Sequence, residues 1–327
     1  MNASPSPALH WNRALTPLPA WELALVVALL AVFAINSALS PYFLNVETLS
    51  DATFQFAEKG IIALPLALLI VSGEIDISVA GIIALASVAM GLAAQAGCAT
   101  PIILGAGLLT GAVAGALNGF LVTMCGVSSI VATIGTMSLF RGGAYAILGD
   151  RAIKHYPESF AFFGQGYVVG LISCELLVFI AMALICALVL HFTIIGRRIY
   201  AIGANPVTAR FSGIHTGAHR FALFVAVGMA SAVAAILLTS RLGSTRPSIA
   251  QGWELEIVSM VILGGVAVDG GRGSIAGVVL AVLLMGFLTV GFGLLNIPGI
   301  VMSIFVGLLL IAVVAVPRLL SVLRSRL

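Results

Sequence analysis

Residues 196–214 read GRRIYAIGANPVTARFSGI and contain a short capped helix between two apolar segments. Asn205 is a favoured N-cap residue, because its side-chain oxygen can accept hydrogen bonds from the free amides of the first turn. Pro206 suits the first helical position, where no backbone N–H is needed, and Gly213 suits a left-handed turn at the end. We therefore predict a helix over 206–212. A helix this short is marginal on its own, so we expect it to dock against another molecule.

The rest of the chain has the composition of an integral membrane protein. Hydrophobic residues form 61% of its 327 residues and charged residues 8%, whereas a soluble domain has roughly 25% charged residues. The mean hydropathy is +1.19. The formal net charge of +3 is small and the basic residues are scattered, which argues against a nucleic-acid partner. The composition predicts an all-α polytopic transmembrane bundle in contact with membrane lipid.

The apolar segments predict about ten spans, since a helix of about 20 mainly apolar residues crosses the hydrocarbon core. The first segment, 23–34, also has the length of a signal-peptide core. Nothing after it resembles a secreted soluble domain, so we favour a retained first helix. We expect the span 255–269 to be the shortest. The predicted spans are 21–40, 54–72, 77–97, 101–124, 128–148, 168–193, 220–241, 255–269, 274–295 and 299–317.

Arginine and lysine residues in short loops orient these spans, because such residues are enriched on the cytoplasmic side. The N-terminal tail 1–20, the loop 195–219 and the C-terminal tail 318–327 all carry arginines, and ten spans place them on one side. We therefore predict that all three are cytoplasmic. The transmembrane domain is then 21–317.

Two loops are predicted to face outward, 149–167 and 242–253. Arg151 and Lys154 in the first loop count against this orientation, while its aromatic residues are typical of a membrane interface.

Glycines recur at near-helical spacing in the fourth span, at 105, 107, 111, 115 and 119. Small residues on one helix face allow backbones to approach closely in lipid. We interpret this stripe as a helix-packing surface.

The turn 72–78, SGEIDIS, places Glu74 and Asp76 between apolar spans. Charges at this depth are costly unless they face water, a partner or helix N-termini. Asp76 and Ser78 both precede a helix start, so either can cap it. Two interpretations stay open: a helix break with capping, and a direct part in a pathway or in coupling.

Four polar residues elsewhere are candidates for a pathway or a gate. The fifth span carries Thr136 and then Arg141, the most deeply placed cation by our span limits. Arg141 either reaches outward or pairs within the bundle, or it touches a solute. Glu254 and Glu256 flank the outward loop 242–253.

The chain shows no catalytic, metal or nucleotide motif. The loop 269–274, DGGRGS, looks like a phosphate loop, but a nucleotide P-loop reads G-x-x-x-x-G-K-[ST], and neither Lys59 nor Lys154 follows such a loop. The five histidines lack metal-ligand spacing. The four cysteines lie in or beside apolar spans, so we interpret them as packing residues. We predict no catalytic residue, metal or cofactor in this chain.

Several motifs together resemble ABC importer permeases of the ribose, xylose and arabinose type, most closely those for rhamnose or autoinducer-2. Residues 196–214 are similar to the loop that contacts the ATPase in this family, and 72–78 to G-G-I-D-L-S, with Glu74 as a departure. Residues 252–257 are similar to G-Y-E-L-D-A, and 269–274 to a G-G-x-G-S loop. The motif V-P-P-F, which is frequent in this family, appears in this chain without its two prolines. The resemblance covers roughly 50–317.

The resemblance implies a permease subunit in the bacterial inner membrane that imports a monosaccharide or related small polar solute, such as rhamnose, autoinducer-2 or ribose. It implies as partners ABC ATPase subunits that hold ATP and Mg, a second permease subunit (identical or homologous) and a periplasmic substrate-binding protein. The residues it indicates for ATPase coupling are Arg197, Gly203, Asn205, Pro206, Arg210, Ser212, Gly213 and Ile214. The pathway or gating candidates are Glu74, Asp76, Ser78, Thr136, Arg141, Glu254 and Glu256.

Two other functions stay open at this point. An ion-coupled secondary transporter places ionisable residues near the bilayer midplane, and the only acid in the sixth span is Glu175, close to its outer end. A membrane-embedded enzyme would need clustered His, Asp or Glu residues, and we find no such cluster.

Overall fold

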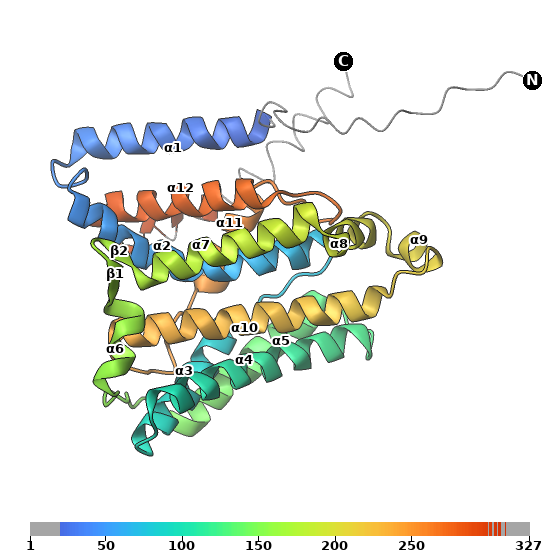
Figure 1. The fold of residues 1–327 in the computed structure, drawn as a ribbon, viewed down its shortest axis with the longest axis horizontal. Coiled ribbons are helices and arrows are strands. Elements are labelled where there is room, and N and C mark those ends of the chain that lie inside the picture. Colours follow the sequence, from blue (N-terminus) through green and yellow to red (C-terminus); the bar gives the residue numbers. More distant parts are fainter. Residues whose placement is uncertain (1–19, 300, 303, 306, 309–310, 312–327) are drawn as a thin grey trace, which may run out of the picture.

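The computed structural model describes residues 20–299 together with 301, 302, 304, 305, 307, 308 and 311. Nearly all of the predicted tails and most of the predicted span 299–317 lie outside these residues. The described chain is a helical bundle whose long helices run along a common direction (Figure 1). Within it, seven helices are long and apolar enough to cross a membrane. The predicted all-α polytopic fold is confirmed.

The long helices are α1 (Ala20–Leu39), α2 (Val46–Val71), α4 (Thr100–Thr123), α5 (Ser129–Leu148), α7 (Cys174–Ala187) with a π-helical continuation (Leu188–Phe192), α10 (Thr216–Leu242) and α12 (Ile275–Leu294). The shorter helices are α3 (Val79–Gln95), α6 (Glu158–Gln165), α8 (Ile194–Ala204), α9 (Pro206–Phe211) and α11 (Trp253–Leu263). One antiparallel hairpin joins β1 (Tyr167–Val169) to β2 (Ile172–Ser173).

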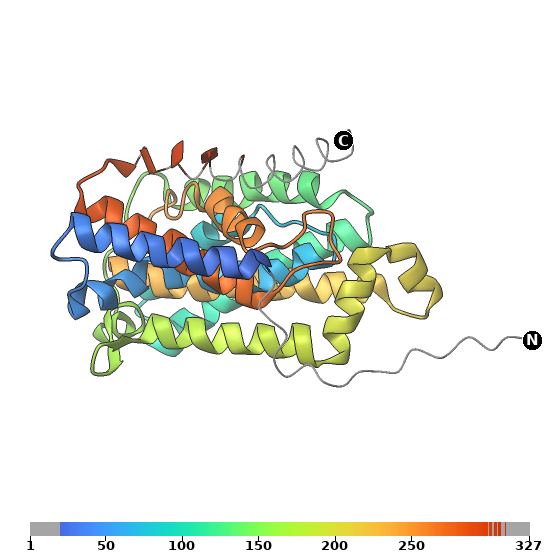
Figure 2. The ribbon, with the colours of Figure 1, turned by 90° about the horizontal axis from the view of Figure 1, so that it is seen from above.

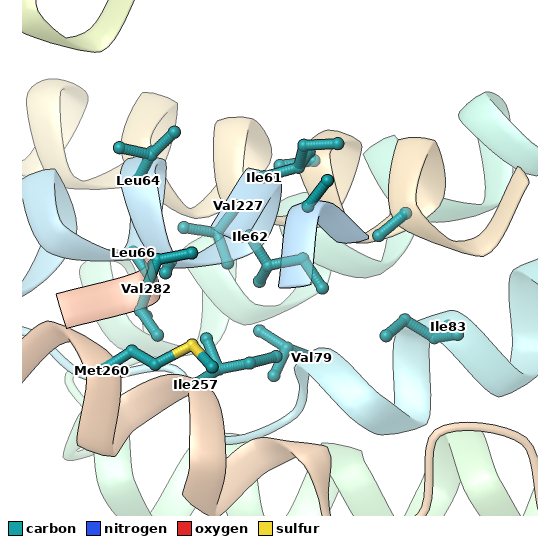
Figure 3. Close-up of a cluster of buried hydrophobic side chains, with 14 of the residues drawn as sticks. Ile61, Ile62, Leu64, Leu66, Val79, Ile83, Val227, Ile257, Met260 and Val282 are labelled. Atoms are coloured by element: carbon teal, nitrogen blue, oxygen red, sulfur yellow. The ribbon is translucent and has the colours of Figure 1, made fainter. Parts of the chain in front are cut away.

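Helix α2 is the centre of the bundle. In its best apolar window 83% of the residues are buried, against 22% for α1. The core of Figure 3 consists of α2 side chains packed against residues of α3, α10, α11 and α12. Those labelled there are Ile61, Ile62, Leu64, Leu66, Val79, Ile83, Val227, Ile257, Met260 and Val282. Because α2 is enclosed by protein, a substitution along it alters the packing against most of the helices around it.

Small residues hold α4 and α10 together. A Cβ atom at Gly111 would lie 2.4 Å from the carbonyl oxygen of Gly228, and one at Gly115 would lie 2.5 Å from that of Phe224. Such close approach lets backbones pack where lipid offers no hydrophobic drive. The predicted packing stripe is confirmed at these positions, whereas Gly105 has no neighbour within 4 Å.

Two predicted spans are shorter than expected. Helix α11 has 11 residues, about 16 Å at 1.5 Å per residue, and the non-helical loop 264–274 follows it. Gly265 and Gly270 take left-handed φ values of 85° and 84° in that loop, which glycine adopts without strain. Helix α7 begins at Cys174 and not near 168, because the apolar residues before it form the β1–β2 hairpin. Apolar strands and an apolar helix start look alike in hydropathy.

The two outward loops of the topology prediction lie together at one end of the bundle. Helix α6 and the hairpin are at that end, and α8 and α9 are at the opposite end (Figures 1 and 2). Ile153 and Thr245 form an antiparallel bridge with N···O distances of 3.1 and 2.9 Å, which joins the two loops. Tyr156 also bonds to Thr245. Burial raises the pKa of Tyr156 to about 12, so its hydroxyl stays un-ionised.

Candidate coupling and pathway sites

Helix α9 is capped as predicted. The side-chain oxygen of Asn205 accepts from the backbone amides of Val207 and Thr208, both at 3.0 Å. Pro206 is the first helical residue. Gly213 ends the helix with a φ of 82°. These local contacts explain why six residues form a helix outside the bundle.

Helix α9 projects from the end of the bundle (Figure 2), and two of its apolar side chains are exposed. Phe211 is 90% exposed and Val207 62% exposed, while Ala209 is buried. Arg197 and Arg210 are exposed, and Arg210 donates to the hydroxyl of Thr216 at 3.5 Å. Ser212 donates to the carbonyl of Thr208, and Ile214 follows the left-handed turn. Val207 and Phe211 lie four positions apart on α9, so they share one exposed apolar face.

Helix α8 connects α9 to the core, and sequence reasoning treated it as loop. Thr193 caps it, because its hydroxyl accepts from the amide of Gly196. Ile199 and Ile202 are fully buried, and the Tyr200 hydroxyl donates to the carbonyl of Gly273 at 2.6 Å. Helix α8 therefore packs firmly on the loop that precedes α12.

Gly203, near the end of α8, lies where two loops meet. The amide of Gly271 donates to the carbonyl of Val71 at 2.8 Å. A Cβ atom at Gly203 would lie 1.8 Å from that carbonyl oxygen and 2.4 Å from the Gly271 nitrogen. No side chain fits at Gly203, so at this position the end of α8 touches the end of α2 and the loop 264–274 through backbone atoms.

The segment 72–78 breaks the helical path between α2 and α3, as one interpretation expected. Ser78 occupies the N-cap position of α3, but its side chain makes no capping hydrogen bond. Asp76 accepts from the amide of Ser78 at 2.8 Å and from its hydroxyl at 2.6 Å, so that hydroxyl is occupied. Asn118 of α4 donates to Asp76 at 3.1 Å and to Ser78 at 2.7 Å, and Thr136 of α5 donates to Asn118 at 2.6 Å.

This network attaches the segment 72–78 to α4 and α5. Asp76, Ser78 and Asn118 are fully buried and Thr136 is 4% exposed. Hydroxyls of α5 also accept from the segment: Ser129 from the amide of Ile75 at 3.3 Å and Thr133 from that of Ile77 at 3.2 Å. Buried polar groups with partners of this kind hold one arrangement of the backbone.

Glu74 joins the same segment to α10. Its carboxylate lies 2.8 Å from a guanidinium nitrogen of Arg220, and Arg220 also donates to the carbonyl of Ser72 at 3.1 Å. The segment 72–78 thus contacts α4, α5, α8 and α10 through its own polar groups or through the adjoining Val71.

Arg141 pairs within the bundle, one of the interpretations given above. Its guanidinium donates to the carbonyl oxygens of Pro247 at 2.7 Å, Ile249 at 2.6 Å and Ala80 at 3.0 Å. The side chain therefore ties α5 to the outward loop 243–252 and to the start of α3.

The two glutamates at the start of α11 have different surroundings. Glu256 forms an ion pair with Lys59 of α2, whose ammonium group lies 5.0 Å from the ring centre of Trp253. Glu254 forms no ion pair in the described chain, and it lines a cavity of about 210 Å³ together with Arg141 and Tyr145 of α5. The pathway candidates thus lie in two groups: Glu74, Asp76, Ser78 and Thr136 belong to the segment 72–78 and its network, whereas Arg141, Glu254 and Glu256 lie around the start of α11 and the loop before it.

Sequence reasoning named Glu175 but missed the charged groups near it, Glu58 and Arg241. Glu58 of α2 is fully buried, and both of its oxygens accept from Arg241 of α10 at 2.9 Å. Glu175 of α7 is also fully buried, and neither of its oxygens has a hydrogen-bond partner. The sequence does contain a signal that could have identified these residues. Glu58 and Lys59 are charged residues within an apolar span, and Asn118 is a polar amide within a glycine-rich span.

The described residues contain no group of three His, Cys, Asp or Glu side chains that could hold a metal ion. The four cysteines have free thiols.

Comparisons with known proteins match this chain to a family of permease components and to relatives that are named permease proteins. The sequence pattern of the family described as "Branched-chain amino acid transport system / permease component" matches residues 48–314. The chain is 38% identical over 300 residues to the autoinducer 2 import system permease protein LsrD of Escherichia coli K12 and to that of Shigella flexneri. It is 37% identical to that of Escherichia coli O157:H7. Each alignment covers 90% of this chain and 91% of the relative. No solved structure matches the chain.

Proposed function

This chain belongs to the permease family of ABC importers, and we propose that it carries autoinducer 2 or a similar small polar solute across the membrane. It is a multi-pass subunit of the bacterial inner membrane and is not itself an enzyme. The comparisons give no support to an ion-coupled secondary transporter. The similarity to permeases named for autoinducer 2 supports this solute over a branched-chain amino acid.

We propose that ATP and Mg bind to separate ATPase subunits and that α9 docks on them. The observation that carries this proposal is the exposed apolar surface of α9 beside exposed arginines. A second permease subunit, identical or homologous, and a periplasmic substrate-binding protein complete the proposed importer. ABC permeases generally work with ATPase and binding-protein partners.

The contacts of Gly203 support a route for the motion of α9. A displacement of α9 moves α8, which packs on the backbone of Val71 and Gly271. The segment 72–78 follows Val71 and is bonded to α5 through Asn118 and Thr136. We infer that closure of the ATPases shifts α5 through these contacts and so opens or closes the path.

Phe211→Ser is expected to abolish solute uptake and to reduce co-purification of the ATPase about tenfold or more. A docked phenylalanine contributes about 1.5–3 kcal/mol of burial, and the serine side chain buries little apolar area. Because Phe211 is exposed in the isolated chain, insertion and yield of the variant should be unchanged. Phe192→Ser, at a 77% exposed site on the spanning segment Cys174–Phe192, is the control and should retain the ATPase. Normal uptake by Phe211→Ser would contradict docking through α9.

The orientation of the bundle gives an independent test. A phosphatase reporter fused after residue 160 is expected to be active, because α6 lies at the end opposite α9. A fusion after residue 207 should be inactive, since α9 is proposed to face the cytoplasm. Inactivity after 160 together with activity after 207 would reverse the bundle and exclude a cytoplasmic ATPase at α9.

A further inference from the structure

Helix α1 lies at the periphery of the bundle, yet two of the side chains that it buries are polar. In its best apolar window 22% of the residues are buried, and the buried residues of α1 are Glu22, Leu25 and Asn36. Glu22 and Asn36 are each 7% exposed. A buried carboxylate in a spanning helix is costly unless it has a partner. The partner of Glu22 therefore indicates what the first turn of α1 does.

The first turn of α1 contacts both ends of the loop that joins α11 to α12. The indole N–H of Trp21 donates at 2.9 Å to the carbonyl oxygen of Leu263, the last residue of α11. The carboxylate of Glu22 accepts from the hydroxyl of Ser274. That hydroxyl in turn caps α12, because it accepts from the amide of Gly277 at 3.0 Å. Two neighbouring side chains of α1 thus hold the two ends of one loop.

Both contacts satisfy the ends of helices. The last carbonyls and the first amides of an α-helix have no partner within it. Trp21 supplies a donor to the end of α11, and Glu22 places a carboxylate near the start of α12, where negative charge is favoured. Trp21 also packs on the loop itself, since a Cβ atom at Gly265 would lie 2.8 Å from a carbon of the indole ring.

The same loop carries the contacts of α8. The amide of Gly271 donates to the carbonyl of Val71 at 2.8 Å, and the backbone of Gly203 lies against both residues. The Tyr200 hydroxyl of α8 donates to the carbonyl of Gly273 at 2.6 Å. The loop whose ends are held by α1 is therefore the surface on which α8 rests.

We propose that Trp21 and Glu22 are positioning residues for coupling, and we call their two contacts the α1 clamp. The clamp holds the loop 264–274 in the conformation that α8 contacts. A displacement of α9 and α8 then reaches the end of α2 and is not absorbed by movement of the loop. This role rests on the proposed function, in which α9 receives the motion of the ATPases.

Three variants and a matched control separate the clamp from simple attachment of α1. Trp21→Phe keeps the aromatic ring and removes the N–H donor. Glu22→Ala removes the carboxylate, and Glu22→Gln keeps an oxygen that can accept from a hydroxyl. Asn36→Ala is the control, because Asn36 is as buried as Glu22 and attaches the other end of α1 by donating to the carbonyl of Phe287 at 3.0 Å.

Hydrogen exchange of the assembled complex in lipid nanodiscs reports on the loop without any solute. We expect the amides of residues 266–277 to exchange about tenfold faster in Glu22→Ala, since a hydrogen bond to a charged group is lost and the loop opens more often. Trp21→Phe should change exchange in the same direction. Glu22→Gln and Asn36→Ala should leave it near that of the unmodified complex. Unchanged exchange of these amides in both Glu22→Ala and Trp21→Phe would overturn the clamp.

The second measurement is the stimulation of ATP hydrolysis by the partner substrate-binding protein. We expect Glu22→Ala to lower the ratio of stimulated to basal hydrolysis about tenfold, in step with the opening of the loop, and Glu22→Gln to restore most of it. Asn36→Ala should retain the ratio. If the loop exchanges faster in Glu22→Ala but this ratio equals that of Asn36→Ala, the clamp has no part in coupling and the inference is wrong.

Uptake of autoinducer 2 by the unmodified complex tests the proposed function separately. The expected exchange and stimulation in a complex that imports no autoinducer 2 would retain the clamp and contradict the proposed solute. Normal import of autoinducer 2 by the unmodified complex and by Glu22→Ala alike would retain the function and overturn the clamp.

Discussion

Gly203→Ala is expected to abolish solute uptake while the chain still inserts and assembles in the membrane. The added Cβ atom would lie 1.8 Å from the carbonyl oxygen of Val71 and 2.4 Å from the Gly271 nitrogen. Neither backbone atom can rotate away as a side chain can, so α8 must move off the junction and take α9 with it. Overpacking of this kind costs about 1–3 kcal/mol, which a bundle of this size tolerates. The loss should therefore be one of coupling, measured as uptake and as solute-stimulated ATP hydrolysis.

Gly217→Ala is the matched control. Gly217 lies in the first turn of α10 at the same end of the bundle, and its added Cβ would meet only Thr123, at 3.9 Å. We expect this variant to import solute normally. If Gly203→Ala transports as well as Gly217→Ala, the backbone contact of α8 does not transmit motion, and the inferred route through the segment 72–78 is wrong.

Glu58→Gln is expected to lower the free energy of unfolding by about 3–5 kcal/mol, the usual effect of removing one partner of a buried ion pair. Both oxygens of Glu58 accept from Arg241, so the amide would leave the guanidinium with a neutral and geometrically poorer partner. The measurement is unfolding of the purified chain by dodecyl sulfate, followed by loss of helical signal.

Glu175→Gln is the control, since it makes the same chemical change at another fully buried glutamate. Glu175 has no hydrogen-bond partner to lose, so we expect a smaller change than that of Glu58→Gln. The double variant Glu58→Gln, Arg241→Gln should recover part of the loss, because no unpaired charge remains. Equal effects of Glu58→Gln and Glu175→Gln would show that the ion pair contributes no stability.

The local features of the chain were predictable from sequence because they depend on neighbouring residues. The cap of Asn205, the first-turn Pro206 and the left-handed Gly213 act over a few positions. The long spans follow from hydropathy in the same way. The failures arose where two local patterns look alike: the apolar β1–β2 hairpin was read as a helix start, and α8 as loop.

The individual residues of the candidate site were predictable from sequence, but the contacts between them were not. Sequence reasoning selected Asp76, Ser78 and Thr136 as polar residues in apolar surroundings, but it did not connect them. Their common partner is Asn118, which lies 42 positions from Asp76 and 18 from Thr136. Hydrogen bonds between residues this far apart in the sequence depend on which helices pack side by side. That arrangement is set by packing, so no local pattern contains it.

The sequence by itself determined that the chain spans the membrane, where most of its helices lie and where α9 begins and ends. Only the tertiary structure decided that α2 is enclosed while α1 is peripheral, that Gly203 touches the end of α2, and that Glu58 meets Arg241. The physical reason is that hydropathy measures preference for hydrocarbon over water. Within a bilayer the protein interior and the lipid-facing surface are almost equally apolar, so the inside of the bundle is chosen by close packing and by polar partners.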